Sequence, residues 1–180
     1  MDIDHLSQEQ YGLLFDVRRS ARYHDRRSGF FTKMHQLTGV LTVLLAGSVI
    51  FDIARPGDSP FWLLALATLG AGLAAIDFVV GYATRATTHR ELKNRWLDLE
   101  IAMIEGDLAE PTWHAYRLQR LRIEKDEPPV YRALDILCHN ELLVAGAHCA
   151  PGDQSPLRAK LSFLQRSTSQ FYRWPNVTAC

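Results

Sequence analysis

This sequence has few cysteines and no net charge, and each of these features argues against a class of protein. Three of the 180 residues are cysteines, and Lys plus Arg and Asp plus Glu both number 20. An odd number of cysteines without framework spacing argues against a disulfide scaffold and favours a reducing compartment. Because the formal net charge is zero, we expect no nucleic-acid partner.

Motifs for catalysis and secretion are missing as well. The sequence contains no G-x-S-x-G, no H-E-x-x-H and no phosphate-binding loop. His24, His89 and His114 form no pair with acidic residues at a spacing that implies acid–base catalysis, so we interpret them as solvent-exposed. The first thirty residues lack the apolar core and cleavage site of a signal peptide. We therefore predict no enzyme, no cofactor and no removable leader.

Residues 138–149, CHNELLVAGAHC, contain the residue types that bind zinc, but not at a suitable spacing. The Cys–His pairs at the two ends of this segment lie about 15 Å apart along a helix that rises 1.5 Å per residue. That distance is too long for one coordination sphere, so we predict no metal site.

Two long runs of the chain are almost free of charge. Residues 34–51 carry no charged side chain, and residues 59–84 carry only that of Asp77. Each run is long enough for a helix to cross a hydrocarbon core about 30 Å thick. Pro56 and Gly57 favour a turn between the two runs. The alternative is a pair of apolar helices inside a soluble bundle.

The predicted fold class is all-α, with a two-span transmembrane hairpin and long cytosolic helix extensions. Its expected parts are a cytosolic N-terminal helix (1–36), transmembrane helix 1 (37–54), an external loop (55–60), transmembrane helix 2 (61–83), its cytosolic extension (84–106), a cytosolic helical pair (111–149) and a C-terminal tail (150–180), loose or on the membrane surface.

Basic residues flank the hairpin on both outer sides, whereas the loop contains Arg55 alone. Because Lys and Arg are retained in the cytoplasm, we predict that both termini are cytoplasmic.

Side chains suited to helix packing recur at alternating spacings of three and four residues on either side of the hairpin, which is typical of a packed seam. Gly106 is expected to end the second of these helices. The first seam is Leu14, Val17, Ala21, His24, Ser28, Phe31, His35, Thr38 and Thr42, and the second is Leu92, Trp96, Leu99 and Met103.

Asp77 is unusual because a carboxylate inside a transmembrane helix is costly. Folding the hairpin brings it near Thr38 and within reach of His35. These residues could line the mouth of an ion path or simply hydrogen-bond the two helices together, and we favour the second role alone.

Small residues on the two spans would allow close helix packing, within the hairpin or between subunits. Two helices cannot enclose water, so any channel must be oligomeric. The small residues are Gly39 and Gly47 on the first span and Ala67, Gly70, Ala71 and Ala74 on the second.

The stretch RRSARYHDRRSGFF, residues 18–31, concentrates arginines just before the first span. We expect Arg18 and Arg19 to pair with Asp98 and Glu100 across the hairpin. Arg22 would face Lys93 and need an outside partner. The remaining two, Arg26 and Arg27, lie nearest to the lipid headgroups.

This stretch, the later HRELKNRWLDLEIAMI and ALDILCHNELL together resemble the SLATT family of bacterial two-transmembrane proteins associated with nucleotide-signalling conflict systems. The resemblance covers residues 10 to about 147. It implies an oligomeric effector of the bacterial inner membrane, which disrupts this membrane when a nucleotide signal or a partner system triggers it. The residues of the motif or partner contact would be Arg18, Arg19, Arg22, Tyr23, His24, Arg26, Arg27, Asn140 and Glu141.

We therefore predict a pore-forming or membrane-disrupting effector in antiphage defence, whose partners are lipid, further copies of itself and a nucleotide-sensing or nucleotide-synthesising system. The alternatives are a non-conducting membrane adaptor that docks a soluble partner through its cytosolic helices, and, less favoured, a membrane enzyme.

Overall fold

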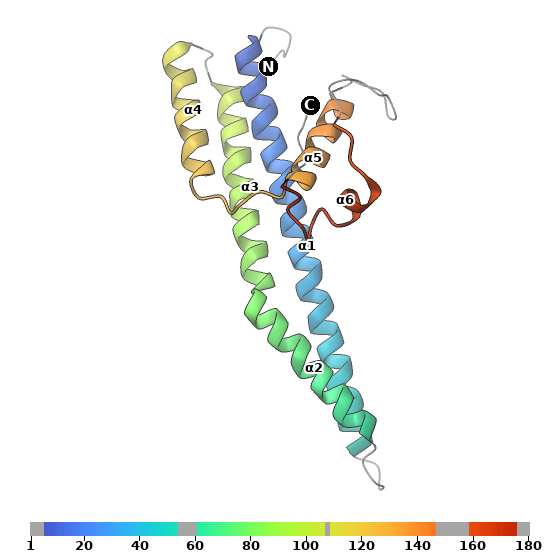
Figure 1. Cartoon of the computed structure of the whole chain (residues 1–180). Helices are drawn as coiled ribbons and strands as arrows, with labels where there is room; N and C mark the ends of the chain where they lie inside the picture. Colours follow the sequence, from blue (N-terminus) through green and yellow to red (C-terminus); the bar gives the residue numbers. More distant parts are fainter. Residues whose placement is uncertain (1–5, 54–60, 107–108, 147–158, 176–180) are drawn as a thin grey trace. The chain divides into compact units, whose positions relative to one another are not determined.

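The computed structural model describes residues 6–53, 61–106, 109–146 and 159–175, and their regular elements are all helices (Figure 1). The all-α prediction is therefore confirmed, while the predicted loop at 55–60 lies outside the described residues. The helices are α1 (Gln8–Ile53), α2 (Phe61–Val80), α3 (Tyr82–Glu105), α4 (Glu110–Glu124), α5 (Arg132–Ala145) and α6 (Phe163–Ser167).

The chain divides into two compact units. Unit 1 consists of Met1–Arg27 and His89–Cys180, and unit 2 of Ser28–Thr88. Both α1 and α3 contribute residues to each unit.

The core of unit 1 is the predicted seam between α1 and α3. All its members in this unit are buried, and Val17, Trp96 and Leu99 have no exposed surface. Trp113, Tyr116 and Ile123 of α4 join the same core. Full burial of a large apolar side chain stabilises a protein by about 1.5–3 kcal/mol, so this core dominates the stability of unit 1. The buried seam members of unit 1 are Leu14, Val17, Ala21, His24, Leu92, Trp96, Leu99 and Met103.

Gly106 ends α3, as predicted, and also lets α4 approach. The Tyr116 hydroxyl donates a hydrogen bond to the Ala102 carbonyl over 2.7 Å. A Cβ at Gly106 would lie 1.8 Å from that hydroxyl oxygen, so no larger residue fits there without displacing Tyr116. The next helix, α5, begins at Arg132 and lies within the predicted cytosolic helical pair.

Unit 2 is a helical hairpin with an antiparallel register. The Ser28 hydroxyl donates to the Ala86 carbonyl over 2.9 Å, and the rings of Phe31 and Tyr82 stack with their centroids 6.3 Å apart. Further along, a Cβ at Gly70 would lie 3.3 Å from Leu45 Cβ. The seam of α1 is buried here at Ser28, Phe31 and Thr38, whereas His35 is exposed and Thr42 half-buried.

Most apolar side chains of unit 2 point away from the hairpin. Two helical stretches are long and apolar enough to cross a membrane, and only 6% and 11% of their most apolar windows are buried. The core of a soluble bundle would be mostly buried, so one copy of the chain does not bury these helices as the soluble alternative requires. Phe61, Phe78 and Val79 are at least 80% exposed.

Gly81 interrupts the helix that the sequence predicted to run unbroken from the second span into its extension. Its φ is +64°, in the left-handed region that glycine adopts without strain. The Gly81 N–H still donates to the Asp77 carbonyl over 2.8 Å, and the Arg85 N–H to the Gly81 carbonyl over 3.0 Å. The chain therefore changes conformation at one residue while its hydrogen-bond ladder continues.

Replacing this glycine tests the break. Gly81→Ala should destabilise the hairpin by about 1–2 kcal/mol, because an L residue is strained at positive φ. Gly72→Ala is the matched control, since a Cβ there meets nothing within 4 Å and alanine is the better helix former. Thermal unfolding of both variants in detergent, followed by circular dichroism, measures the difference. Equal melting temperatures would contradict the left-handed conformation.

Candidate functional site

The structure brings together two of the three polar residues predicted inside the hairpin. His35 Nδ1 lies 2.8 Å from Asp77 Oδ2, and the two side chains are 51% and 20% exposed. The Thr38 hydroxyl instead donates to the carbonyls of Met34 and His35, both at 3.0 Å. The Thr38 hydroxyl is thus hydrogen-bonded within α1, and the Asp77 carboxylate contacts the His35 imidazole instead.

A pocket of about 560 Å³ adjoins this pair in unit 2. Asp77, His35 and Thr38 line it together with two of the predicted small residues, Gly39 and Ala74. The polar groups of the spans therefore border a hollow rather than a packed interface.

Of the small residues predicted to pack the spans, Gly70 alone is buried within one chain, against Leu45. A Cβ at Gly39 or Gly47 would meet nothing within 4 Å. The three alanines at 67, 71 and 74 are exposed. These small residues therefore lie on the surface of the hairpin, where a helix of another molecule could pack against them.

In unit 1, one of the two predicted ion pairs between α1 and α3 forms. Arg18 Nε lies 2.7 Å from Glu100 Oε1. The prediction for Arg19 was wrong, because its guanidinium lies 3.2 Å from Asp16 and 3.1 Å from Asp135 of α5. Burial raises the pKa of the Asp135 carboxyl, although Arg19 opposes this shift.

Arg26 and Arg27, which the sequence analysis expected to lie nearest to lipid headgroups, both have partners inside unit 1. Arg26 pairs with Glu141 of α5. Arg27 is only 3% exposed and donates to the Gln170 carbonyl over 2.6 Å, with its guanidinium 4.1 Å from the centre of the Tyr131 ring. These partners come from α5, from Tyr131 just before it and from Gln170 of the tail, all of which are distant from α1 in the sequence.

Part of the predicted loose tail is held by Asn140. The Asn140 side chain donates to the Ala159 carbonyl over 2.8 Å and accepts from the Ala159 N–H at 3.1 Å. With the bond from Arg27 to Gln170, these contacts attach the described tail residues 159–175 to α5 and α1. Asn140 is 9% exposed, so this motif residue has a structural role within the chain.

The interpretation of His24 and His89 as solvent-exposed was wrong. They are 1% and 5% exposed, and their Nδ1 atoms lie 2.8 Å apart. On the other side of the ring, His24 Nε2 lies 2.8 Å from Glu127 Oε1, which also accepts from the Trp96 indole N–H over 2.6 Å. His114 is exposed, as expected.

Glu127 Oε1 thus lies within hydrogen-bond distance of both the Trp96 indole N–H and His24 Nε2, and the second nitrogen of His24 contacts His89. The spacing could have revealed the histidine pair, since His89 lies three residues before Leu92 and extends its seam backwards.

Tyr23 and Cys138 lie together in a small second cluster of unit 1. The Tyr23 hydroxyl accepts the Tyr131 N–H at 3.0 Å. Burial raises the pKa of the Tyr23 hydroxyl to about 12 and that of the Cys138 thiol to about 12. A thiol that holds its proton so strongly is a poor nucleophile and a poor metal ligand.

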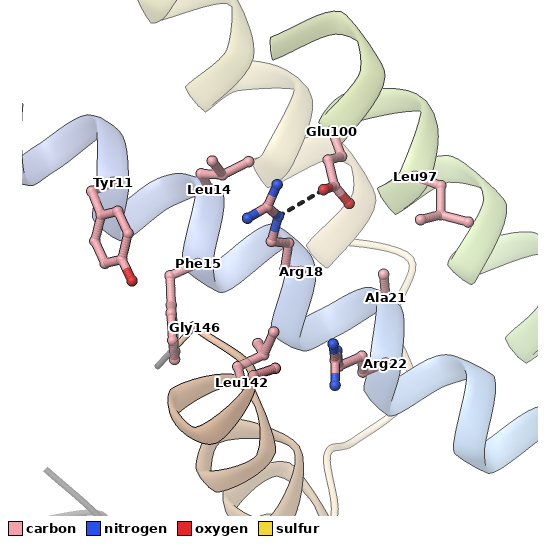
Figure 2. Close-up of a pocket in the computed structure, with 11 residues that line it drawn as sticks. Tyr11, Leu14, Phe15, Arg18, Ala21, Arg22, Leu97, Glu100, Leu142 and Gly146 are labelled. Carbon is pink, nitrogen blue, oxygen red and sulfur yellow. Dashed lines mark hydrogen bonds and ion pairs between the residues drawn. The ribbon is translucent and has the colours of Figure 1, made fainter. Parts of the chain in front are cut away.

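A pocket of about 440 Å³ is lined by residues of α1, α3 and α5 in unit 1, and Figure 2 shows these residues. Its walls are mainly apolar, and its charged groups are Arg18, Arg22 and Glu100. Lys93, the residue predicted to face Arg22, pairs with Asp25 at 2.7 Å. Arg22 has no ion pair or hydrogen bond to the described residues. The residues that line this pocket are Tyr11, Leu14, Phe15, Arg18, Ala21, Arg22, Leu97, Glu100, Leu142, Ala145 and Gly146.

Comparisons with family models, with curated proteins and with solved structures found no match. Across the described ranges of the chain, no group of three or more His, Cys, Asp or Glu side chains could hold a metal ion. Two members of the supposed zinc motif, His148 and Cys149, lie outside those ranges.

The network around His24 should be important for stability. Glu127→Ala removes the acceptor of two buried N–H groups, which should cost about 1–3 kcal/mol. Glu105→Ala, at the exposed end of α3, is the control and should change the stability little. Chemical unfolding of the full chain, followed by tryptophan fluorescence, compares them. Equal midpoints would show that the network does not stabilise unit 1.

Alkaline pH should destabilise unit 1 partly through Cys138. The unfolded thiol loses its proton near pH 9.0, whereas the folded thiol keeps it to about 12. The free energy of unfolding should therefore fall above pH 9, by up to about 1.4 kcal/mol per pH unit for this group. Cys138→Ala should have a shallower decline between pH 9 and 10, because Tyr23 begins to contribute only near 10.0. Parallel declines would contradict the buried, protonated thiol.

Proposed function

We propose that this protein is a membrane effector of a bacterial conflict system, which oligomerises in the inner membrane and permeabilises it when a signal reaches unit 1. The observation that carries the proposal is the surface of unit 2, where exposed apolar side chains surround the pair of His35 and Asp77. The resemblance to SLATT proteins supports the role in a bacterial conflict system, in which a nucleotide-sensing or nucleotide-synthesising partner would be the source of the signal.

Membrane insertion is supported by the side chains that unit 2 leaves uncovered. Water contact with so many large apolar groups costs about 1.5–3 kcal/mol for each one that could be buried. Lipid covers them without further protein, and both helices are long enough to cross it. By the positive-inside rule, unit 1 and both termini would then lie in the cytoplasm.

Assembly is supported by the polar pair and by the open glycine positions. One hairpin encloses no path for water, so permeation requires several copies or a local disruption of lipid. Gly39 and Gly47 offer a smooth surface at which a second hairpin can pack closely. Asp77 and His35 border a hollow in each copy, and this hollow would become part of the path or of the contact between subunits.

The test is the membrane potential of bacteria that express the protein together with its neighbouring genes, which would supply the signal. We expect the wild-type chain to collapse it, as reported by a voltage-sensitive dye, and Asp77→Asn to weaken the effect. Polar contacts between membrane helices contribute about 0.6–1.7 kcal/mol, a roughly three- to twentyfold change in an assembly equilibrium. Asp98→Asn, an exposed position in unit 1, is the control.

Insertion and conductance must be scored separately. Membrane fractionation shows whether each variant is inserted, and efflux of a dye from liposomes shows whether the purified protein permeabilises them. Stable insertion with an intact potential and no efflux would instead support a non-conducting adaptor that docks a soluble partner through unit 1. Recovery of the chain in the soluble fraction would overturn both functions.

A further inference from the structure

We infer that the pocket between α1, α3 and α5 of unit 1 binds a small organic monoanion with an apolar body. The site goes beyond the proposed function and does not depend on it, because binding can be measured without reference to permeability. The inference rests on the size of the pocket, its apolar walls and the one arginine at its edge that the described protein leaves without a partner.

The size and walls suit a small molecule. Pockets that bind such ligands usually have volumes of about 300–1,000 Å³ and are mostly apolar with a few polar groups, and this one measures about 440 Å³. Leu14 and Phe15 of α1, Leu97 of α3 and Leu142 of α5 form its apolar surfaces (Figure 2). A flat hydrocarbon or aromatic body would remove these groups from water.

The charges favour an anion. Two arginines and one glutamate line the pocket, which leaves one positive charge. Arg18 is already paired with Glu100 at 2.7 Å, so the excess belongs to Arg22. A guanidinium presents a planar set of N–H donors that matches a carboxylate or a phosphate ester, and such bonds are stronger than neutral ones.

Arg22 stands out from the other arginines of its stretch. Four of them are engaged inside unit 1, by Glu100, by Asp16 and Asp135, by Glu141 and by the Gln170 carbonyl. Arg22 has no such contact with the described residues, although it lies one helical turn from both Arg18 and Arg26. An added anion would therefore neutralise a cation that lies between two others.

The experiment uses ¹⁹F NMR of 4-(trifluoromethyl)benzoate added to the full chain in nanodiscs of zwitterionic lipid, with empty nanodiscs as the blank. We expect the benzoate signal to broaden on binding, and the neutral 4-(trifluoromethyl)benzamide to bind about tenfold more weakly. Arg22→Gln should reduce the benzoate affinity by about the same factor and leave the benzamide unchanged. Arg122→Gln, an exposed arginine of α4, makes the same charge change away from the pocket.

Ala145→Leu provides a second test that does not depend on charge. Ala145 is exposed at the end of α5 and lines the pocket, so the larger side chain should narrow the pocket without disturbing the core and weaken binding of both probes. Nanodiscs that contain phosphatidylglycerol show whether the anion is a lipid headgroup or a free molecule. If this lipid competes with benzoate for the pocket, the pocket binds a headgroup, and the inference that it binds a small free anion is overturned. Absence of binding by the wild type, or equal affinity for benzoate and benzamide, would overturn the inference altogether.

Discussion

The close packing of α1 against α3 is the constraint on which unit 1 depends. Side chains at alternating spacings of three and four residues are removed from water on both helices, and Val17, Trp96 and Leu99 are completely covered. Such a seam allows only a narrow range of helix registers, because sliding one helix by a residue would expose the whole set. The same register aligns His24 with His89 and Arg18 with Glu100.

Polar contacts then divide the arginine-rich stretch by direction around α1. One face turns toward α3, where Arg18 meets Glu100, and another toward α5, where Arg19 and Arg26 meet carboxylates. Arg27 is covered by Tyr131 and by the tail. What is a single basic cluster in the sequence becomes a set of contacts that connect α1 to α3, to α5 and to the tail.

The periodicity of the sequence was sufficient to predict the longer helices, the seam and the end of α3, because local spacing determines which side of a helix is apolar. It also brought Asp77 within reach of His35, since the turn between two apolar runs sets the register of a hairpin. It did not predict α6, which lies in the segment expected to be a loose or membrane-surface tail. Periodicity could not predict the partners of Arg19, Arg26 and Arg27. These partners come mainly from α5 and residues 159–175, whose positions depend on tertiary packing. The break at Gly81 was missed because an isolated glycine is tolerated in a helix and carries no signal of its own φ.

The contacts of Arg27 with Tyr131 and Gln170 also bear on how the chain is made. Unit 1 combines Met1–Arg27 with a much later part of the sequence, whereas unit 2 lies between them. Translation at about 5–20 residues per second releases the hairpin seconds before Gln170 emerges. During that interval Arg26 and Arg27 lack the partners that later hold them, which are Glu141 for Arg26 and Tyr131 and Gln170 for Arg27. These two arginines therefore acquire their contacts in unit 1 only after the whole of unit 2 has been synthesised.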